Sequence, residues 1–269
     1  MIPNPIAKVL FTIRKHRVRA LLMGGQACVL YGAAEFSRDV DLAIPADPGN
    51  LRRLRKALAE LRADVIAVPP LLARHLRRGH AVHFRCFHPE AERIRVDVMS
   101  KMRGIEPFEK LWARRTTVIL PEGVSCHVLS LPDLVRAKKT QRDKDWPMIR
   151  RLAEAHYFEH RRHPNRAQVA FWLMELRTPE LIMEVARRYQ RACRRLAAAR
   201  PLLAHALSSD HEELFRELGQ EEAAERDRDR RYWSPLRRQL EALRHSRRGR
   251  PRRRLQYGGS RNYRISFRV

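Results

Sequence analysis

The 269-residue sequence has no long apolar run and only four cysteines, and both shortages narrow the class of protein. No apolar stretch approaches the roughly 18 residues of a transmembrane helix, so we expect no membrane span. The first residues also lack the charged segment, apolar stretch and cleavage site of a secretory signal. Cys28, Cys86, Cys126 and Cys193 stand far apart, which is typical of reduced thiols rather than of a disulfide framework. We therefore predict a cytoplasmic protein with no membrane partner.

Acidic residues and lysines are also scarce. The sequence sets 30 Asp and Glu against 56 Lys and Arg, which gives a formal charge of +26 and a pI of about 11.3. A charge of this sign favours polyanionic partners. Only eight of the basic residues are lysine, so an arginine-biased, GC-rich coding background explains the charge equally well. The charge therefore indicates a class of partner and no particular function.

The first 164 residues alternate short β-branched runs with helical patterns, which predicts an α/β or α+β domain. The predicted strands cover residues 20–23, 40–44, 65–68, 81–87, 93–99, 116–120 and 126–129, and the predicted helices cover 26–31, 50–61 and 107–114. Ser130 stands before an apolar helical pattern that contains Pro132. A further helix should therefore begin there, with Ser130 as its cap and proline in its first turn.

Strand patterns stop after residue 164. Segments 166–176, 179–199 and 212–226 carry apolar residues at helical spacing, so we predict a helical region over residues 165–243. From Arg244 to the end there are ten arginines and no acid, interleaved with glycine, proline and tyrosine. This composition predicts a mobile tail over residues 244–269, and the alternative is a tail that binds the RNA or DNA backbone.

One segment carries residues typical of a catalytic site. A predicted strand runs into Gly24 and Gly25, a helix follows, and the next strand carries Asp39 and Asp41. Side chains two apart on a strand share a face, so these carboxylates converge, and a divalent cation such as Mg²⁺ or Mn²⁺ would offset their repulsion. Glycines let backbone N–H groups approach a phosphate closely. A third aspartate, Asp97, lies in a later strand and could complete a metal site or accept a proton.

These motifs resemble the DNA polymerase beta-type nucleotidyltransferase superfamily, whose signature is a small-residue pair, Asp-x-Asp and a third Asp on a later strand. Within that superfamily the sequence is similar to the prokaryotic nucleotidyltransferase toxins of abortive-infection and type IV toxin–antitoxin systems, which share the Ser-x-Asp-x-Asp form seen at residues 37–41. The segment 131–145 strengthens the match, because a Leu-x-x-x-Lys helix leads there into an Arg-x-Lys-Asp turn. The resemblance covers roughly residues 18–155 and implies a mixed sheet flanked by helices.

Carried over by position, the resemblance also implies the site residues. The catalytic residues that bind Mg²⁺ or Mn²⁺ would be Asp39, Asp41 and Asp97, with Asp97 as third ligand or base. The triphosphate of an NTP would be contacted by Gly24, Gly25 and Ser37, and Lys138 would pair with phosphate. The nucleotide cleft would be lined or braced by Arg142, Lys144 and Asp145. The implied reaction moves a nucleoside monophosphate from the NTP to an acceptor hydroxyl. The acceptor would be RNA, with a tRNA 3′ end as the specific expectation, in a toxin that has an antitoxin protein as partner.

Two other functions stay open. One is a noncatalytic nucleic-acid-binding protein on the same fold. The other is a small-molecule nucleotidyltransferase, which the charge of +26 disfavours because such sites recruit cationic substrates with acidic clefts.

Structural roles also compete with functional ones at single residues. Asp97 could pair with Arg93 or Arg95, and Arg142 could form an ion pair with Asp145. A zinc site from His80, His83, Cys86 and His88 is disfavoured, because strand alternation sends His83 to the face opposite His80 and His88. Cys28 has no His or Asp partner nearby in sequence and is expected to be a small packed residue.

Overall fold

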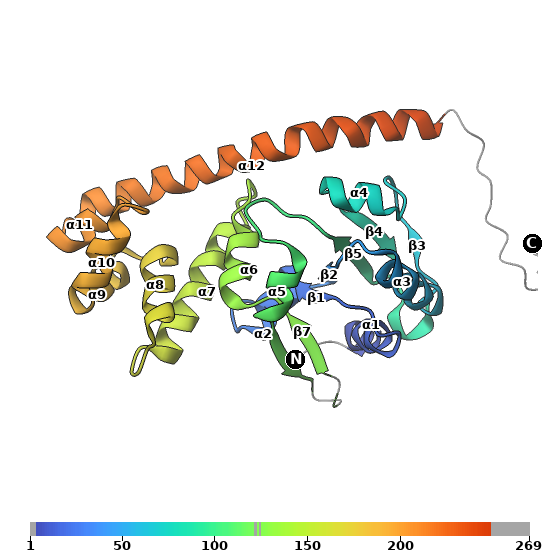
Figure 1. Ribbon diagram of the computed structural model, residues 1–269, viewed down its shortest axis with the longest axis horizontal. Helices are drawn as coiled ribbons and strands as arrows, with labels where there is room; N and C mark the ends of the chain where they lie inside the picture. Colours follow the sequence, from blue (N-terminus) through green and yellow to red (C-terminus); the bar gives the residue numbers. More distant parts are fainter. Residues whose placement is uncertain (1–3, 121–122, 124, 249–269) are drawn as a thin grey trace, which may run out of the picture.

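The computed structural model describes residues 4–120, 123 and 125–248, and seven strands form one mixed sheet within them (Figure 1). The strand order is β3-β4-β5-β2-β1-β7-β6. Pairing is parallel between β2 and β5 and between β1 and β7, and antiparallel elsewhere. The strands are β1 (Leu21–Met23), β2 (Asp39–Ala43), β3 (Asp64–Val65), β4 (Val82–Arg85), β5 (Arg95–Met99), β6 (Thr116–Ile119) and β7 (Ser125–Val128). Every predicted strand is present, and the predicted mixed α/β fold with a helical C-terminal region is confirmed.

Burial alternates along the central strands, as the sequence pattern requires. In β2 and β5 the apolar residues Val40, Leu42, Val96 and Val98 are at most 1% exposed, whereas the residues between them are half-buried. One face of the sheet therefore belongs to the core. The other face carries the polar side chains of β2 and β5, which are half-buried.

Helices before residue 164 cap and flank this sheet. They are α1 (Asn4–Lys15), α2 (Gly24–Leu30), α3 (Pro48–Glu60), α4 (Ala73–Arg78), α5 (Phe108–Ala113), α6 (Leu131–Lys138), α7 (Asp145–His160) and a 3₁₀ turn η1 (Pro89–Ala91). The Ser130 side chain accepts a hydrogen bond from the backbone N–H of Asp133, and Pro132 lies in the first turn of α6, so the predicted cap is confirmed. One boundary was wrong: α2 begins at Gly24 rather than after the glycine pair, although the φ of +67° at Gly24 lies outside the right-handed helical range.

The C-terminal region is helical, with α8 (Arg166–Glu175), α9 (Pro179–Arg188), α10 (Gln190–Ala197), α11 (Leu203–Ser208) and α12 (His211–Arg248). Two sequence expectations were wrong here. The predicted helix over 179–199 is broken at Tyr189, whose ψ of 48° leaves the helical range. The helix predicted over 212–226 continues to Arg248 and is 38 residues long, so residues 244–248 of the predicted tail are helical. The remainder of that tail, 249–269, lies outside the described residues.

Helix α12 crosses from the helical region back over the sheet domain, toward α4 (Figure 1). Its Asp229 is only 3% exposed and accepts hydrogen bonds from the Arg103 side chain at 3.2 Å and from the backbone N–H of Gln141 at 2.9 Å. Farther along, Gln239 contacts His80 at 2.8 Å. These contacts tie α12 to the loops after β5 and α6. No helix in the described ranges is long and apolar enough to cross a membrane.

Replacing Asp229 with alanine should destabilise the protein by about 1–3 kcal/mol, because the Gln141 N–H loses its partner and Arg103 loses one of its two carboxylates. Urea unfolding measures the change. The matched control is Asp227→Ala on the same helix, where an exposed pair with Arg230 is lost and the expected cost is about 0.5 kcal/mol or less. Equal effects of the two substitutions would contradict the anchoring role of Asp229.

Candidate active site

The register of β2 and β5 brings the three predicted aspartates together. Asp41 lies directly opposite Asp97, and Asp39 lies opposite Arg95. Opposed residues on neighbouring strands project to the same face of a sheet, and so do residues two apart on one strand. Asp39, Asp41 and Asp97 therefore share the face of the sheet opposite the buried valines and leucine of β2 and β5, which we call the carboxylate face. Arg95 shares it with them.

Gly24 and Gly25 make room for this face. Gly24 has φ of +67°, and a Cβ there would lie 1.8 Å from Oδ2 of Asp41. A Cβ on Gly25 would lie 2.4 Å from Oγ of Ser37. Both distances are far below van der Waals contact, so only glycine permits the approach of α2 to Asp41 and Ser37. The spacing of the glycine pair, Ser37 and Asp41 in the sequence thus reflects direct contact in space.

Gln26 holds the loop that carries Ser37, and sequence reasoning missed it. Its side chain is 1% exposed and donates a hydrogen bond from Nε2 to the carbonyl oxygen of Ser37 at 2.7 Å. Its Oε1 has no hydrogen-bond partner within the described residues. The only signal in the sequence was its position directly after the glycine pair.

Asp97 is held by two neighbours on the same face. Arg95 Nε and His83 Nδ1 each lie 2.8 Å from Oδ1 of Asp97, and Arg95 also lies 3.0 Å from Nδ1 of His83. Burial alone would raise the pKa of Asp97, but the hydrogen bonds from His83 and Arg95 outweigh it and lower that pKa. The predicted alternative pairing with Arg95 is confirmed. His83 was missed as a site residue because its place opposite Asp97 depends on the β4–β5 register.

Asp41 has the opposite electrostatic balance. Burial and the neighbouring Asp97 raise the pKa of Asp41 to about 6, although Lys138 and a hydrogen bond from the Gly25 backbone act to lower it. Asp39 adds to the repulsion. The negative charge of this carboxylate is therefore only partly compensated by the protein itself.

The predicted phosphate-binding residues of segment 131–145 form a structural network centred on Asp145. Lys138 Nζ lies 3.1 Å from Oδ1 of Asp145, and Thr140 Oγ1 and Arg142 Nε lie 2.6 and 2.8 Å from its Oδ2. Burial would raise the pKa of Asp145, but Lys138, Thr140 and Arg142 together lower it. The predicted ion pair of Arg142 with Asp145 is present. Lys144, by contrast, is exposed at the start of α7.

The donors on the carboxylate face fit a hard divalent cation, because Mg²⁺ and Mn²⁺ prefer carboxylate oxygens. Both contacts of Asp97 go to Oδ1, which leaves Oδ2 without a hydrogen-bond partner in the described part of the chain. The three carboxylates do not form one tight cluster. Among the described residues, the group of ligand atoms that lie within 4.8 Å of one another is His205, Glu213 and Glu217, at the junction of α11 and α12.

The other histidines and Cys28 have structural surroundings. His80 contacts α12, and Nδ1 of His88 accepts a hydrogen bond from the backbone N–H of Glu90 in η1. Cys86 is fully buried. Cys28 is also fully buried, and desolvation raises the pKa of its thiol to about 11, so it is no nucleophile at neutral pH. The expectation that Cys28 is a packed residue is confirmed.

The raised pKa of Asp41 predicts how stability depends on pH. The protonated form is favoured in the fold, so its stabilising contribution is present below pH 3.8 and is lost as pH rises through about 6. In EDTA, Asp41→Asn should therefore stabilise the protein by about 1–3 kcal/mol at pH 8 and have little effect at pH 4. Urea unfolding at both values measures this. An exposed control, Asp64→Asn, should change neither, and an Asp41→Asn variant that is less stable at pH 8 would contradict the prediction.

No family model and no curated protein matches the chain. Among solved structures, the chain is similar to one described as a tRNA nucleotidyltransferase complexed with a primer tRNA and an incoming ATP analogue. That similarity has a TM-score of 0.28 and 12% sequence identity, and it covers 91% of this chain and 87% of the other. With a TM-score this low, the similarity supports no conclusion about the fold, the site residues or the activity of this chain.

Proposed function

We propose that the protein is a metal-dependent nucleotidyltransferase, which moves a nucleoside monophosphate from an NTP to an acceptor hydroxyl and releases pyrophosphate. The observation that carries the proposal is the register that sets Asp41 beside Asp97, with the backbone of Gly24 against Asp41. A partly buried carboxylate whose charge is only partly compensated is costly for the fold, and a bound cation would reduce that cost. A role in binding the cation would explain why an aspartate stands at position 41 despite this cost.

Each residue of the carboxylate face has a role in this proposal. Asp39, Asp41 and Asp97 would hold Mg²⁺ or Mn²⁺, which when bound would offset charge on the phosphates. The backbone at Gly24 and Gly25 and the hydroxyl of Ser37 would orient the triphosphate, because the two glycines let the start of α2 approach Asp41 and Ser37 closely. These contacts position the nucleotide without moving a proton.

Asp97 fits the role of ligand better than that of base. Its pKa is lowered by His83 and Arg95, and a weakly basic carboxylate is a poor acceptor for a hydroxyl proton at neutral pH. Its free Oδ2 is the atom available to a cation. Of the two roles that the resemblance implies for Asp97, the proposal therefore keeps the ligand.

The resemblance implies that Lys138, Arg142 and Lys144 bind the nucleotide, and their surroundings differ. Lys138 is 9% exposed and tied to Asp145, so it would act on Asp41 and the phosphates through its charge, from a fixed place. Arg142 is also tied to Asp145, but its side chain is 57% exposed. Lys144 is exposed, and its contact with a phosphate stays a prediction of the resemblance.

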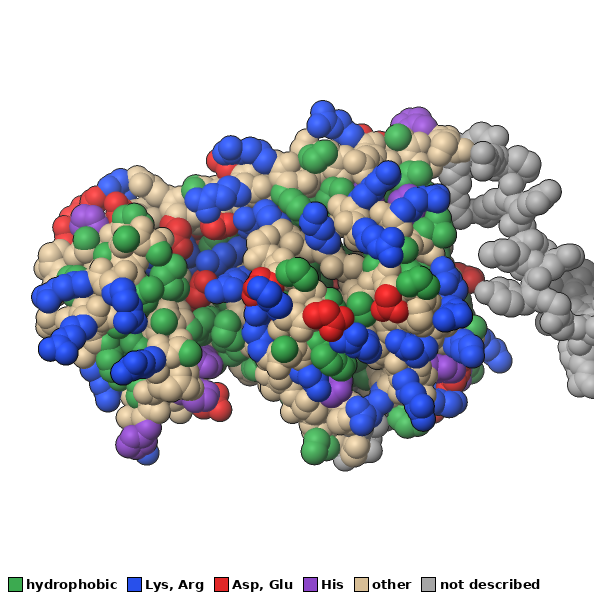
Figure 2. Space-filling view, viewed as in Figure 1, with side chains coloured by type: hydrophobic (Ala, Val, Ile, Leu, Met, Phe, Trp, Pro, Cys, Tyr) green, Lys and Arg blue, Asp and Glu red, His purple; other side chains and the backbone are tan. Residues whose placement is uncertain are grey.

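For the acceptor, the proposal keeps RNA, with a tRNA 3′ end as its specific form. The support is the charge of +26, since a basic surface attracts an RNA backbone and repels cationic small molecules. Basic side chains cover much of the face shown in Figure 2, and acidic ones gather in small groups. The toxic role and the antitoxin partner stay predictions of the resemblance, because no described feature bears on them.

A second function, nucleic-acid binding without transfer, is favoured by one observation. Arg95 and His83 both contact Oδ1 of Asp97, so the protein itself already gives this carboxylate two partners, of which Arg95 carries a positive charge. A face that is stable in this way does not require a metal. Nucleotidyl transfer requires Asp39 and Asp41 as metal ligands, whereas nucleic-acid binding without transfer requires neither carboxylate.

The test is transfer of label from α-³²P NTPs to total tRNA in Mg²⁺ or Mn²⁺. Asp41→Asn and Asp39→Asn should each lower the rate about 100-fold or more, because each removes a metal ligand. The exposed control Asp64→Asn should retain full activity. Transfer that is unaffected by both site substitutions, or no transfer with any of the four NTPs while RNA still binds, would overturn the proposal and favour the binding function.

A further inference from the structure

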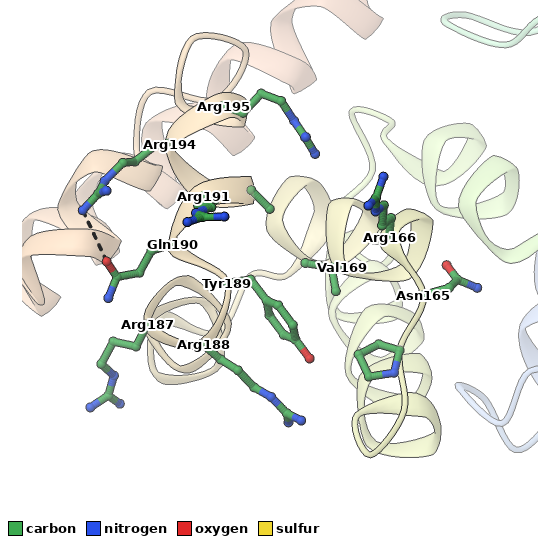
Figure 3. Close-up of a pocket in the computed structure, with 12 residues that line it drawn as sticks. Asn165, Arg166, Val169, Arg187, Arg188, Tyr189, Gln190, Arg191, Arg194 and Arg195 are labelled. Atoms are coloured by element: carbon green, nitrogen blue, oxygen red, sulfur yellow. Dashed lines mark hydrogen bonds between the residues drawn. The ribbon is translucent and has the colours of Figure 1, made fainter.

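A second basic site lies in the helical region, away from the carboxylate face. An open pocket of about 780 Å³ is formed where the start of α8 faces the junction of α9 and α10 (Figure 3). No acidic residue lines it. Six arginines do, and they are Arg166, Arg187, Arg188, Arg191, Arg194 and Arg195. The pocket therefore concentrates positive charge without any compensating carboxylate of its own.

The break at Tyr189 divides these arginines between two helices. Arg187 and Arg188 end α9, and α10 begins one residue after Tyr189. Within α10, Arg191, Arg194 and Arg195 are spaced three and four apart, so they share one face of the helix. Because the five positions follow i, i+1, i+4, i+7 and i+8, they would also share one face of a continuous helix over 179–199. The concentration of charge therefore follows from the spacing of the arginines, and both helix ends line the pocket.

These arginines are unlike others in the helical region. Arg177 and Arg200 are buried and bind Glu221 at 3.3 and 3.0 Å, so they are structural. The six pocket arginines are exposed, and none forms an ion pair within the described ranges. Their only side-chain hydrogen bonds are from Arg188 to the carbonyl oxygen of Arg161 and from Arg194 to Gln190. The remaining guanidinium groups are free to bind an external anion.

Tyr189 adds an aromatic surface to the charge. Its side chain is partly buried and extends between the two arginine groups, toward α8 (Figure 3). The guanidinium carbon of Arg188 lies 5.4 Å from the centre of its ring. A planar guanidinium matches the geometry of a phosphate, and a tyrosine ring can stack on an unpaired base. Arginines on three helices of one pocket fit a ligand with several phosphates.

We propose that this pocket binds the sugar-phosphate backbone of an RNA, with Tyr189 stacked on an unpaired base, and that it holds the acceptor RNA whose end reaches the carboxylate face. Only the second part rests on the proposed function. The helical region adjoins the sheet domain through α7, so one RNA molecule lying along the protein could contact both (Figure 1).

The binding test uses the full chain carrying Asp41→Asn, without NTP, and a fluorescently labelled single-stranded RNA. The pocket variant Arg187→Gln/Arg191→Gln/Arg195→Gln should weaken binding about 10-fold or more at about 0.1 M salt, and should reduce the slope of log K against log salt by about 2. Tyr189→Leu should weaken binding about 5- to 30-fold with little change in slope. Circular dichroism should show that both variants keep the fold.

The matched control is Arg52→Gln/Arg237→Gln/Arg238→Gln, which removes the same charge from exposed positions on α3 and α12 and should change binding less than 3-fold. Equal weakening by the control and the pocket variant would overturn the proposal, because net charge alone would then explain binding. Competition by poly-glutamate as strong as by RNA, with no effect of Tyr189→Leu, would assign the pocket to acidic protein instead and would also overturn it.

The acceptor role is tested separately, in the chain with Asp41 intact. There the pocket variant should raise the KM for RNA about 10-fold, and the control triple variant should not. If no chain transfers label but RNA binding still depends on the pocket, the proposed function fails and the RNA site stands. If transfer occurs and the pocket variant leaves both binding and KM unchanged, the pocket proposal fails alone.

Discussion

Repulsion between Asp41 and Asp97 is the constraint around which the carboxylate face is organised. The parallel pairing of β2 with β5 leaves these two carboxylates directly opposed. Arg95 and His83 compensate Asp97, whereas Asp41 receives only the Gly25 backbone and the field of Lys138. The result is one carboxylate with a lowered pKa beside one with a raised pKa. Such an asymmetric pair is costly to keep, and perturbed pKa values of this kind cluster at functional sites.

Most of the sheet could be predicted because its signal is local. The alternation of valines and aspartates in β2 and β5 already predicts which side chains face the core. The sequence grouped Gly24 and Asp41 in one site, whereas their direct contact is seen only in the structure. By contrast, His83 and Arg95 become partners of Asp97 only through strand register, which involves residues far apart in sequence. No periodicity within a single segment contains that information.

The helical region was less predictable for the same reason. Tyr189 interrupts a segment whose apolar spacing continues through it, so the break between α9 and α10 has no sequence signal. The full length of α12 was missed because most of its surface is polar and its anchors, Asp229 and Leu236, are few. Both errors concern tertiary contacts that override local pattern. The arginine pocket lies at the unpredicted break, where the end of α9 meets the start of α10.

The central claim, that the carboxylate face is a cation site, is tested most directly by a crystal structure with Mn²⁺ and a nonhydrolysable NTP. We predict an anomalous Mn²⁺ peak bound by carboxylate oxygens of Asp39, Asp41 and Asp97, with the triphosphate against Gly24 and Gly25. A structure with no Mn²⁺ on this face would contradict the account, whether the metal is absent or lies only at His205, Glu213 and Glu217.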